Sequence, residues 1–342
     1  MIEKLSILNQ HIIDCLQNAY GIEFTVLTPL LWGADINASV YKALATDKST
    51  YFVKLKRGKN HNISVRVIEL LENAGIRQII PIIKTTDGLP IQAIGDDFTL
   101  CASPFIEWEN GLNRDLSDSQ WRTLGKVMRK IHDIKAPFEL QMKIRKESYA
   151  FKWGEIVRSL YRHIECQSIK SRPINDEIAV QLELFMIKYK VTIFRLIDAA
   201  EKLVQQIRGQ PSQFVLCHSD IHAGNVLIDE NDGLYILDWD DPIRAPKERD
   251  LMFIGGGVAN AWNKLHEEEL FYKSYGKTEV NRTILAYYRH ARIVEDIALY
   301  GQQMLLTKVE RQTGMIMYKQ FVDQFNPNGV VDIVLKSAEP HV

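Results

Sequence analysis

One short loop of the sequence carries an unusual set of side chains that can move a proton or bind a metal. The stretch HSDIHAGN, residues 218–225, holds His218, Asp220 and Asn225 between the apolar runs FVLC and VLID. A second acidic cluster, DWDD at residues 238–241, follows the apolar run LYIL. Polar clusters that interrupt short apolar runs are typical of loops between strands. The sequence therefore predicts a polar loop that two short strands position.

Phosphoryl transfer requires side chains of these types. A carboxylate orients the attacking hydroxyl and accepts its proton, and hard oxygen ligands hold the Mg²⁺ that bridges the nucleotide phosphates. Asp220 suits the first role, while Asn225 and Asp238 suit the second, because a hairpin would bring Asp238 back beside Asn225. The order matches the kinase pattern H-R-D-x-x-x-x-N followed by a metal-binding Asp. We interpret the loop as the catalytic loop of a phosphotransferase.

Two other interpretations compete with this one. A plain polar hairpin would use Asp and Asn to cap its turns, which explains DENDG at residues 229–233 well but explains His218, Asp220 and His222 poorly. A metal hydrolase would use the H-x-D-x-H triplet formed by those same three residues. Zinc and di-metal sites usually need further histidines, and the remaining histidines show no pair at ligand spacing. The phosphotransferase interpretation is favoured over both.

A nucleotide kinase also needs a cation for the phosphates. In the predicted strand TYFVKLKR, alternation places Phe52, Lys54 and Lys56 on one face. An unpaired ammonium in the middle of a strand would be costly, so Lys54 should have an anionic partner. We expect Lys54 to bind the nucleotide phosphates, whereas a solvated side chain is the simpler explanation for Lys56.

Two further segments complete the expected nucleotide site. The turn LLWGADINAS has only Gly33 and no G-x-G-x-x-G, but its small polar residues could cover phosphates through backbone amides. These residues are Asp35, Asn37 and Ser39. The connector CASPFIEWENG could offer backbone groups to an adenine ring near Phe105 to Glu107, although a plain interdomain linker would look the same.

The elements that must position these residues change character along the chain. Residues 1–104 alternate mostly as strands do, with one or two helices, whose patterns are MIEKLSILNQHIIDCLQ and ISVRVIELLENAG. Three long helical patterns follow, over residues 116–134, 145–208 and 284–306. The predicted fold class is α+β and bilobal. A small β-rich lobe over residues 1–104 would bind the nucleotide, and a larger helical lobe over residues 105–342 would carry the catalytic loop, the helical insert 145–208 and the acceptor site.

The composition excludes several classes of protein. The 342 residues carry a formal net charge of −1, which creates no field for nucleic acid or an anionic membrane. The four cysteines lie far apart without a C-x-x-C pair, as in reduced cytosolic proteins. The N-terminal residues lack a signal-peptide pattern, and the longest uncharged run is too short and glycine-rich to span a bilayer. We expect a cytoplasmic monomer whose partners are a nucleotide and a small molecule.

These motifs resemble those of the aminoglycoside phosphotransferases. This family is related to the protein kinases and also includes choline and homoserine kinase-like enzymes. The resemblance rests on CHSDIHAGNVLI, LYILDWDDP, APKERDLMFIGG, YFVKLKRG and the helix ending LGKVMRKIHDI, and it covers nearly the whole chain. It implies a protein-kinase-like fold that uses Mg²⁺ and ATP or GTP. The implied roles are Asp220 as catalytic base, Asn225 and Asp238 as magnesium ligands, Lys54 at the phosphates, and His218 and Asp250 as supports of the catalytic loop.

One departure from the family pattern concerns the partner of Lys54. The family usually places a glutamate early in the first-lobe helix to pair with this lysine. Here Asn62 or Ser64 stands at that position, and Glu69 and Glu72 fall one or two turns later. Which residue pairs with Lys54 therefore stays open, and a catalytically weak kinase-like binding module is the alternative that this departure suggests.

A small molecule is the expected acceptor. Asp238 is followed by WDDP rather than the glycine of D-F-G, and no A-P-E segment follows, which argues against a protein kinase. Because cationic antibiotics favour acidic pockets, Asp240, Glu295 and Asp296 are the candidates for acceptor binding. Within the family, the layout is most similar to the spectinomycin phosphotransferases, which phosphorylate a hydroxyl of an aminocyclitol antibiotic. We expect that activity and a role in antibiotic resistance, with a kinase of choline or homoserine as the alternative.

Overall fold

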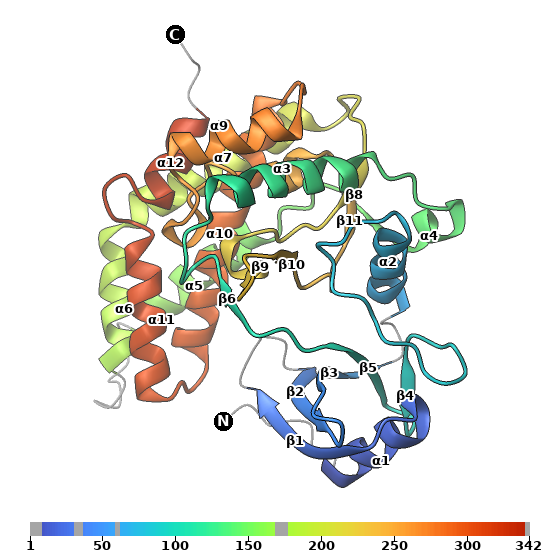
Figure 1. Ribbon diagram of the computed structural model, residues 1–342. Helices are drawn as coiled ribbons and strands as arrows, with labels where there is room; N and C mark the ends of the chain where they lie inside the picture. The colour runs from blue at the N-terminus through green and yellow to red at the C-terminus, as the bar shows by residue number, and fades with distance from the viewer. Residues whose placement is uncertain (1–8, 31–36, 59–61, 168–176, 339–342) are drawn as a thin grey trace. The chain divides into compact units, whose positions relative to one another are not determined.

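The computed structural model describes residues 9–30, 37–58, 62–167 and 177–338 (Figure 1). The chain forms two compact units, each assembled from segments that are separate in the sequence. Unit 1 contains residues 1–116, 127–145 and 218–244. Unit 2 contains residues 117–126, 146–217 and 245–342. All the residues of the predicted catalytic loop and metal site therefore belong to unit 1.

A five-stranded antiparallel sheet forms the first part of unit 1, in the order β1-β2-β3-β5-β4. Its strands are β1 (Phe24–Leu30), β2 (Ala38–Ala45), β3 (Thr50–Arg57), β4 (Gln92–Ile94) and β5 (Phe98–Pro104). Strands β2 and β3 pair as an antiparallel hairpin, and β3 coincides with the predicted strand TYFVKLKR. Figure 1 shows this sheet in blue and cyan with α1 (Asn9–Tyr20) beside it.

The two faces of β3 have opposite characters because side chains alternate along a strand. Val53 and Leu55 are fully buried, in a core that includes Ile12 and Leu16 of α1. Lys54 therefore points to the other face, where its neighbours across the sheet are Val40 of β2 and Cys101 of β5. This alternation brings the predicted phosphate-binding lysine out of the core.

A smaller sheet, in the order β10-β9-β6, completes the part of unit 1 that surrounds the site. Its strands are β6 (Trp108–Asn110), β9 (Val226–Asp229) and β10 (Leu234–Ile236). The predicted turn DENDG joins β9 to β10, and Asp232 there has a left-handed backbone with φ of +63°. Unit 1 also contains α2 (Asn62–Asn73) and α4 (Phe138–Lys143), while α3 (Asp118–Asp133) is divided between the units.

Unit 2 is mainly helical. Its helices are α5 (Trp153–Gln167), α6 (Glu177–Lys188), α7 (Lys190–Ile207), α8 (Glu248–Leu251), α9 (Leu265–Tyr275), α10 (Arg282–Leu306), α11 (Arg311–Asp323) and α12 (Val330–Ser337). Ile293, Val294 and Ile297 of the long helix α10 are fully buried in its core. Gly301 of α10 allows close packing on α5, since a Cβ there would lie 2.4 Å from Leu160 Cδ1.

The remaining strands are short, and helices occupy much of the predicted helical insert. The strands are β7 (Arg145–Lys146), β8 (Val215–Cys217) and β11 (Ile243–Ala245). Helices α5, α6 and α7 lie within residues 145–208, whereas the lobe boundary at residue 104 stays a prediction. Within the described residues, no helix has the length and apolar character required to cross a bilayer.

Candidate active site

The loop that precedes β9 is held by hydrogen bonds among its own residues. The backbone amide of His222 and the side-chain amide of Asn225 both donate to the carbonyl oxygen of Asp220, each at 2.9 Å. Gly224 N donates to His222 Nδ1 at 3.0 Å, which caps the short 3₁₀ turn Ala223–Asn225. The Asp220 side chain is 41% exposed, and one of its carboxylate oxygens lies 3.6 Å from His222 Nε2. Backbone bonding therefore orients the loop while the carboxylate stays accessible.

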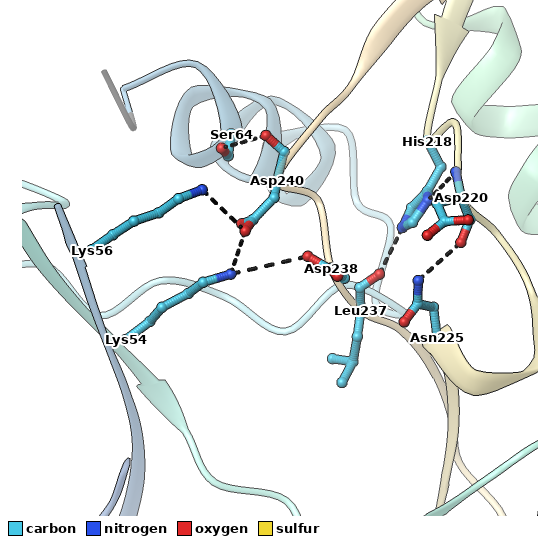
Figure 2. A network of polar contacts seen from close by, with 9 residues as sticks. All are labelled: Lys54, Lys56, Ser64, His218, Asp220, Asn225, Leu237, Asp238 and Asp240. Atoms are coloured by element: carbon cyan, nitrogen blue, oxygen red, sulfur yellow. Dashed lines mark hydrogen bonds and ion pairs between the residues drawn. The ribbon is translucent and has the colours of Figure 1, made fainter. Parts of the chain in front are cut away.

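His218 joins this loop to the segment that carries Asp238. Its Nδ1 accepts the backbone N–H of Asp220 at 3.2 Å, and its Nε2 lies 2.6 Å from the carbonyl oxygen of Leu237 (Figure 2). Because a backbone amide can only donate and a carbonyl can only accept, His218 carries its proton on Nε2. The Trp239 ring packs edge-on at 4.6 Å, and His218 is buried. Its position suits the predicted role as a support of the catalytic loop.

These contacts argue against the metal-hydrolase interpretation. Both ring nitrogens of His218 are occupied by backbone groups, and Nδ1 of His222 accepts from Gly224. Within the described residues, His218, Asp220 and His222 do not bring three ligand atoms to a common point. The H-x-D-x-H triplet therefore shapes a loop and does not form a zinc site there.

Asn225 and Asp238 lie on adjacent segments, as the predicted hairpin requires. Leu237 N donates to the carbonyl oxygen of Asn225 at 2.9 Å, which joins the residue before Asp238 to the end of the loop. Asp238 adopts a left-handed backbone with φ of +61°, an unusual conformation for a residue other than glycine. Such conformations cluster at functional sites, where the surrounding structure enforces them. The Asp238 side chain is 52% exposed.

Lys54 has the anionic partner that its position in β3 predicts, and that partner is Asp240. Lys54 Nζ lies 2.6 Å from Asp240 Oδ2 and 4.0 Å from Asp238 Oδ1 (Figure 2). Lys56 Nζ lies 3.2 Å from the same Asp240 oxygen. The expectation of a solvated Lys56 is therefore wrong, because 83% of its side chain is buried and it reaches Asp240. Glu69, one of the two alternatives for Lys54, instead pairs with Lys84 at 3.1 Å.

The electrostatics of this cluster follow from burial and charge together. Burial disfavours the Lys54 ammonium, but Asp240 and then Asp238 outweigh burial and place the pKa of Lys54 above its ordinary value. Burial acts to raise the pKa of Asp240, yet the two lysines lower it below its ordinary value. Burial raises the pKa of Asp238, and Lys54 offsets this only in part. Of the two carboxylates, Asp240 therefore interacts more strongly with the lysines.

A cavity of about 460 Å³ in unit 1 adjoins these charged residues. Its apolar walls come from β2, β3, the connector after β5, β6 and the β9–β10 hairpin. They include Val40, Phe52, Phe105, Ile106, Trp108, Leu227 and Ile236. Its polar end is lined by Lys54, Lys56, Asn225, Asp238 and Asp240. A slot of this kind suits a ligand with a flat apolar ring and an anionic tail.

The other residues predicted to bind the nucleotide have different surroundings. Phe105 lines the cavity, and Lys42 lies 4.3 Å above its ring. Glu107 is largely exposed and forms an ion pair with Lys42. Ser39 is buried in β2 on the same face as Tyr41, opposite Val40. The roles of Phe105, Glu107 and Ser39 stay predictions. Gly33 and Asp35 of the preceding turn lie outside the described residues.

Three predicted residues belong to unit 2. Asp296 forms an ion pair with Arg292 at 3.0 Å on helix α10, next to Glu295. Asp250 lies buried in α8, where it contributes, after burial itself, to raising the pKa of the Cys217 thiol. Acceptor binding by Glu295 and Asp296, and support of the loop by Asp250, stay predictions.

Comparisons with known proteins identify the family. A model described as a phosphotransferase enzyme family matches residues 29–254. The chain belongs to this family. It is similar to the crystal structure of spectinomycin phosphotransferase APH(9)-Ia in complex with ADP and spectinomycin, with 44% identity and a TM-score of 0.89, over 97% of this chain and 99% of that chain. The AMP-bound complex of spectinomycin phosphotransferase APH(9)-Ia matches with 42% identity and a TM-score of 0.84, over 96% and 98% of the two chains.

A more distant match supports the fold. An aminoglycoside phosphotransferase from Alicyclobacillus acidocaldarius shares 13% identity with a TM-score of 0.65, over 98% of this chain and 96% of that chain. A comparison with curated proteins finds no match. The predicted α+β, kinase-like fold class is confirmed, and the chain is a phosphotransferase that acts on a hydroxyl group.

Proposed function

We propose that the protein transfers the γ-phosphoryl group of ATP to a hydroxyl of spectinomycin and thereby confers resistance to this antibiotic. The observation that carries the proposal is the 44% identity, over nearly all of both chains, to a spectinomycin phosphotransferase that binds ADP and spectinomycin. The arrangement of Asp220, Asn225, Asp238 and Lys54 supports a competent enzyme. A catalytically weak binding module is disfavoured, because Lys54 has a carboxylate partner despite the missing helix glutamate.

The nucleotide would occupy the cavity of unit 1. Its adenine ring would lie among the apolar lining residues, which include Val40, Phe52, Leu227 and Ile236. The connector at Phe105 would supply backbone groups for the ring edge. The phosphates would then extend to the polar end, where Lys54 presents a partly buried ammonium. ATP is preferred over GTP because both similar complexes contain an adenine nucleotide.

Asn225 and Asp238 fit a magnesium ion. The Nδ2 group of Asn225 donates to Asp220 O, which leaves its amide oxygen directed away from that bond as a potential ligand. Asp238 offers a half-exposed carboxylate on the adjoining segment. One amide oxygen and one carboxylate are hard donors of the kind that Mg²⁺ prefers, with phosphates and water completing its octahedron. When bound, Mg²⁺ would neutralise charge on the transferring phosphoryl group.

Asp220 would act as the catalytic base. Its carboxylate would orient the acceptor hydroxyl and take up the hydroxyl proton, while the hydroxyl oxygen forms a bond to the γ-phosphorus and ADP leaves. The hydrogen bonds at the Asp220 backbone suit this role, because they hold the residue through its N–H and carbonyl groups. Lys54 would stabilise negative charge on the phosphates. We expect the enzyme to act as a cytoplasmic monomer.

An acceptor assay tests the proposal. The purified protein is incubated with ATP, Mg²⁺ and, separately, spectinomycin, choline or homoserine, and products are analysed by mass spectrometry. We expect spectinomycin alone to gain a phosphoryl group. Expression in a susceptible bacterium should raise the spectinomycin concentration needed to stop growth. Phosphorylation of choline or homoserine without phosphorylation of spectinomycin would contradict the proposal.

A further inference from the structure

We propose that Asp240 is a positioning residue that holds Lys54, with Lys56 beside it, at the phosphate end of the cavity. This inference rests on the proposed function, since it explains how the lysine that would bind the phosphates is placed. It differs from the acceptor-binding role that the acidic sequence around Asp240 suggested.

The first support is that two lysines converge on one carboxylate oxygen. Lys54 and Lys56 alternate onto the same face of β3, and their ammonium groups lie 2.6 Å and 3.2 Å from Asp240 Oδ2. The three side chains are mostly buried, with 21%, 17% and 31% of their surfaces exposed. At low exposure an ion pair is screened less than at the surface, so the arrangement constrains both lysines. Figure 2 shows the two long side chains pointing at this single carboxylate.

The second support is that the other carboxylates considered as partners of Lys54 do not form a hydrogen-bonded ion pair with it. Among the described residues, Asp238 is the second acid within ion-pair distance of Lys54, but 4.0 Å is beyond hydrogen-bond reach. Glu69 of α2 is engaged by Lys84. Glu72 lies exposed at the end of the same helix. Asp240 therefore takes the place that a helix glutamate was expected to fill.

The third support is that Asp240 is itself held in place. Ser64 of α2 donates from its hydroxyl to the carbonyl oxygen of Asp240 at 3.3 Å. On the preceding side, Trp239 is 3% exposed and packs against His218 of the catalytic loop. Because the Asp240 backbone is held from α2 and the preceding Trp239 is packed against His218, the Asp240 carboxylate has a fixed base from which to orient Lys54. Because an ammonium has three donors and Asp240 takes one, Lys54 keeps donors for phosphate oxygens.

The test compares two neighbouring aspartates. Asp240→Asn removes the charge with little change in shape, and Asp241→Asn is the matched control, because Asp241 is largely exposed and pairs with Arg145. Kd for a non-hydrolysable ATP analogue is measured by calorimetry, together with kcat and KM for ATP with spectinomycin. We expect Asp240→Asn to raise Kd and KM for the nucleotide and to lower kcat/KM about 100-fold, as misplacement of a group by about 1 Å can do. Asp241→Asn should stay within about twofold of the wild type.

A double-mutant cycle shows whether Asp240 acts through Lys54. If it does, Asp240→Asn should cost little more in an enzyme that already carries Lys54→Met, because the group being positioned is gone. An equal loss in both backgrounds would overturn the proposal in favour of a direct role at the metal or acceptor. Equal kinetics for Asp240→Asn and Asp241→Asn would also overturn it.

Two further measurements keep the outcomes distinct. Thermal unfolding verifies that each variant is folded, and Asp240→Glu, which keeps the charge, should recover a large part of the lost nucleotide affinity. If Asp240→Asn is unfolded, Asp240→Ser replaces it in the same cycle, and an equal loss from folded Asp240→Ser in both Lys54 backgrounds would overturn the proposal. Nucleotide binding requires no acceptor, so it tests Asp240 even if spectinomycin is not phosphorylated. Phosphorylation of spectinomycin that is unaffected by Asp240→Asn would instead remove this inference and leave the proposed function intact.

Discussion

The catalytic loop and the phosphate end of the cavity are built in different ways. The loop around Asp220 is held mainly by hydrogen bonds among residues 218–241, and Gly111 N, which donates to Ala223 O at 3.0 Å, adds one contact from far away in the sequence. The phosphate end depends on ion pairs between Lys54 or Lys56 and Asp240, which are 186 and 184 residues apart in the chain. The loop is specified mainly by local sequence, whereas the lysine cluster forms only once unit 1 has folded.

This difference separates the two functions that the site would perform. Local hydrogen bonds to Asp220 can hold the base even if the lysines move, because none of those bonds involves β3. The placement of Lys54, in contrast, depends on packing that brings β3 to Asp240. Mutations in the loop should therefore affect the chemical step, and mutations in the lysine cluster should affect nucleotide binding as well.

The largest effect is expected for Asp220→Asn. The substitution keeps the backbone bonds of the loop but removes the group that would accept the hydroxyl proton, so kcat should fall about 10³-fold, within the range for general bases. Affinity for a non-hydrolysable ATP analogue should stay within about twofold, because the lysine cluster is untouched. Steady-state kinetics and calorimetry measure the two quantities. A kcat within tenfold of the wild type would mean that Asp220 is not the base.

The next effect is expected for Lys54→Met. Loss of the ammonium should lower kcat/KM for ATP about 10²-fold, the scale for removing one preorganised donor from a transition state. Unlike Asp220→Asn, it should also weaken nucleotide binding, which calorimetry detects. Lys56→Met is the matched comparison, because Lys56 shares the same strand face and the same Asp240 oxygen at a longer distance. A larger loss in Lys56→Met than in Lys54→Met would reverse the assignment of the phosphate-binding lysine.

The same division explains how much of the site could be predicted from the sequence. The order of Asp220, Asn225 and Asp238 along a strand–loop–hairpin is a local pattern, and the hairpin does join Asn225 to the residue before Asp238. The position of Lys54 in a strand predicted that it needs an anionic partner. The sequence did not predict which residue that partner is. Asp240 lies far away in the sequence, and no periodicity connects it to β3.

The spacing of the charged residues gave a partial indication of the pairing between the lysines and Asp240. The lysines are two residues apart on β3, so alternation places both on one face, and Asp238 and Asp240 are also two residues apart. Such spacing suggests facing pairs but does not show that the segments meet. The backbone at Asp238, which precedes Asp240, has a left-handed conformation. The sequence does not predict this conformation, because Asp238 is not a glycine.

A stability effect is expected for His218→Ala. The substitution leaves the carbonyl oxygen of Leu237 and the N–H of Asp220 without their partner, and each unsatisfied buried group costs about 1–3 kcal/mol. We expect the free energy of unfolding to decrease by about 2–4 kcal/mol. We also expect a lower kcat, because Asp220 is held less firmly. Chemical denaturation and kinetics measure both. His222→Ala, which removes one bond to Gly224, should be milder; equal destabilisation by the two variants would show that His218 does not link the two segments.

The smallest effect is expected for Asp232→Asn, in the turn between β9 and β10. Asp232 lies in the hairpin that Asn225 and Asp238 flank, but its side chain is 71% exposed and pairs with Arg114 at the surface. Exposed pairs contribute about 0–1 kcal/mol, and Asn tolerates the left-handed backbone that Asp232 adopts. Stability, kcat and KM should therefore remain close to those of the wild type. A marked loss of activity would show that the turn contributes to the site. Burial and ion-pair partners would then not distinguish the functional acidic residues of this region from the structural ones.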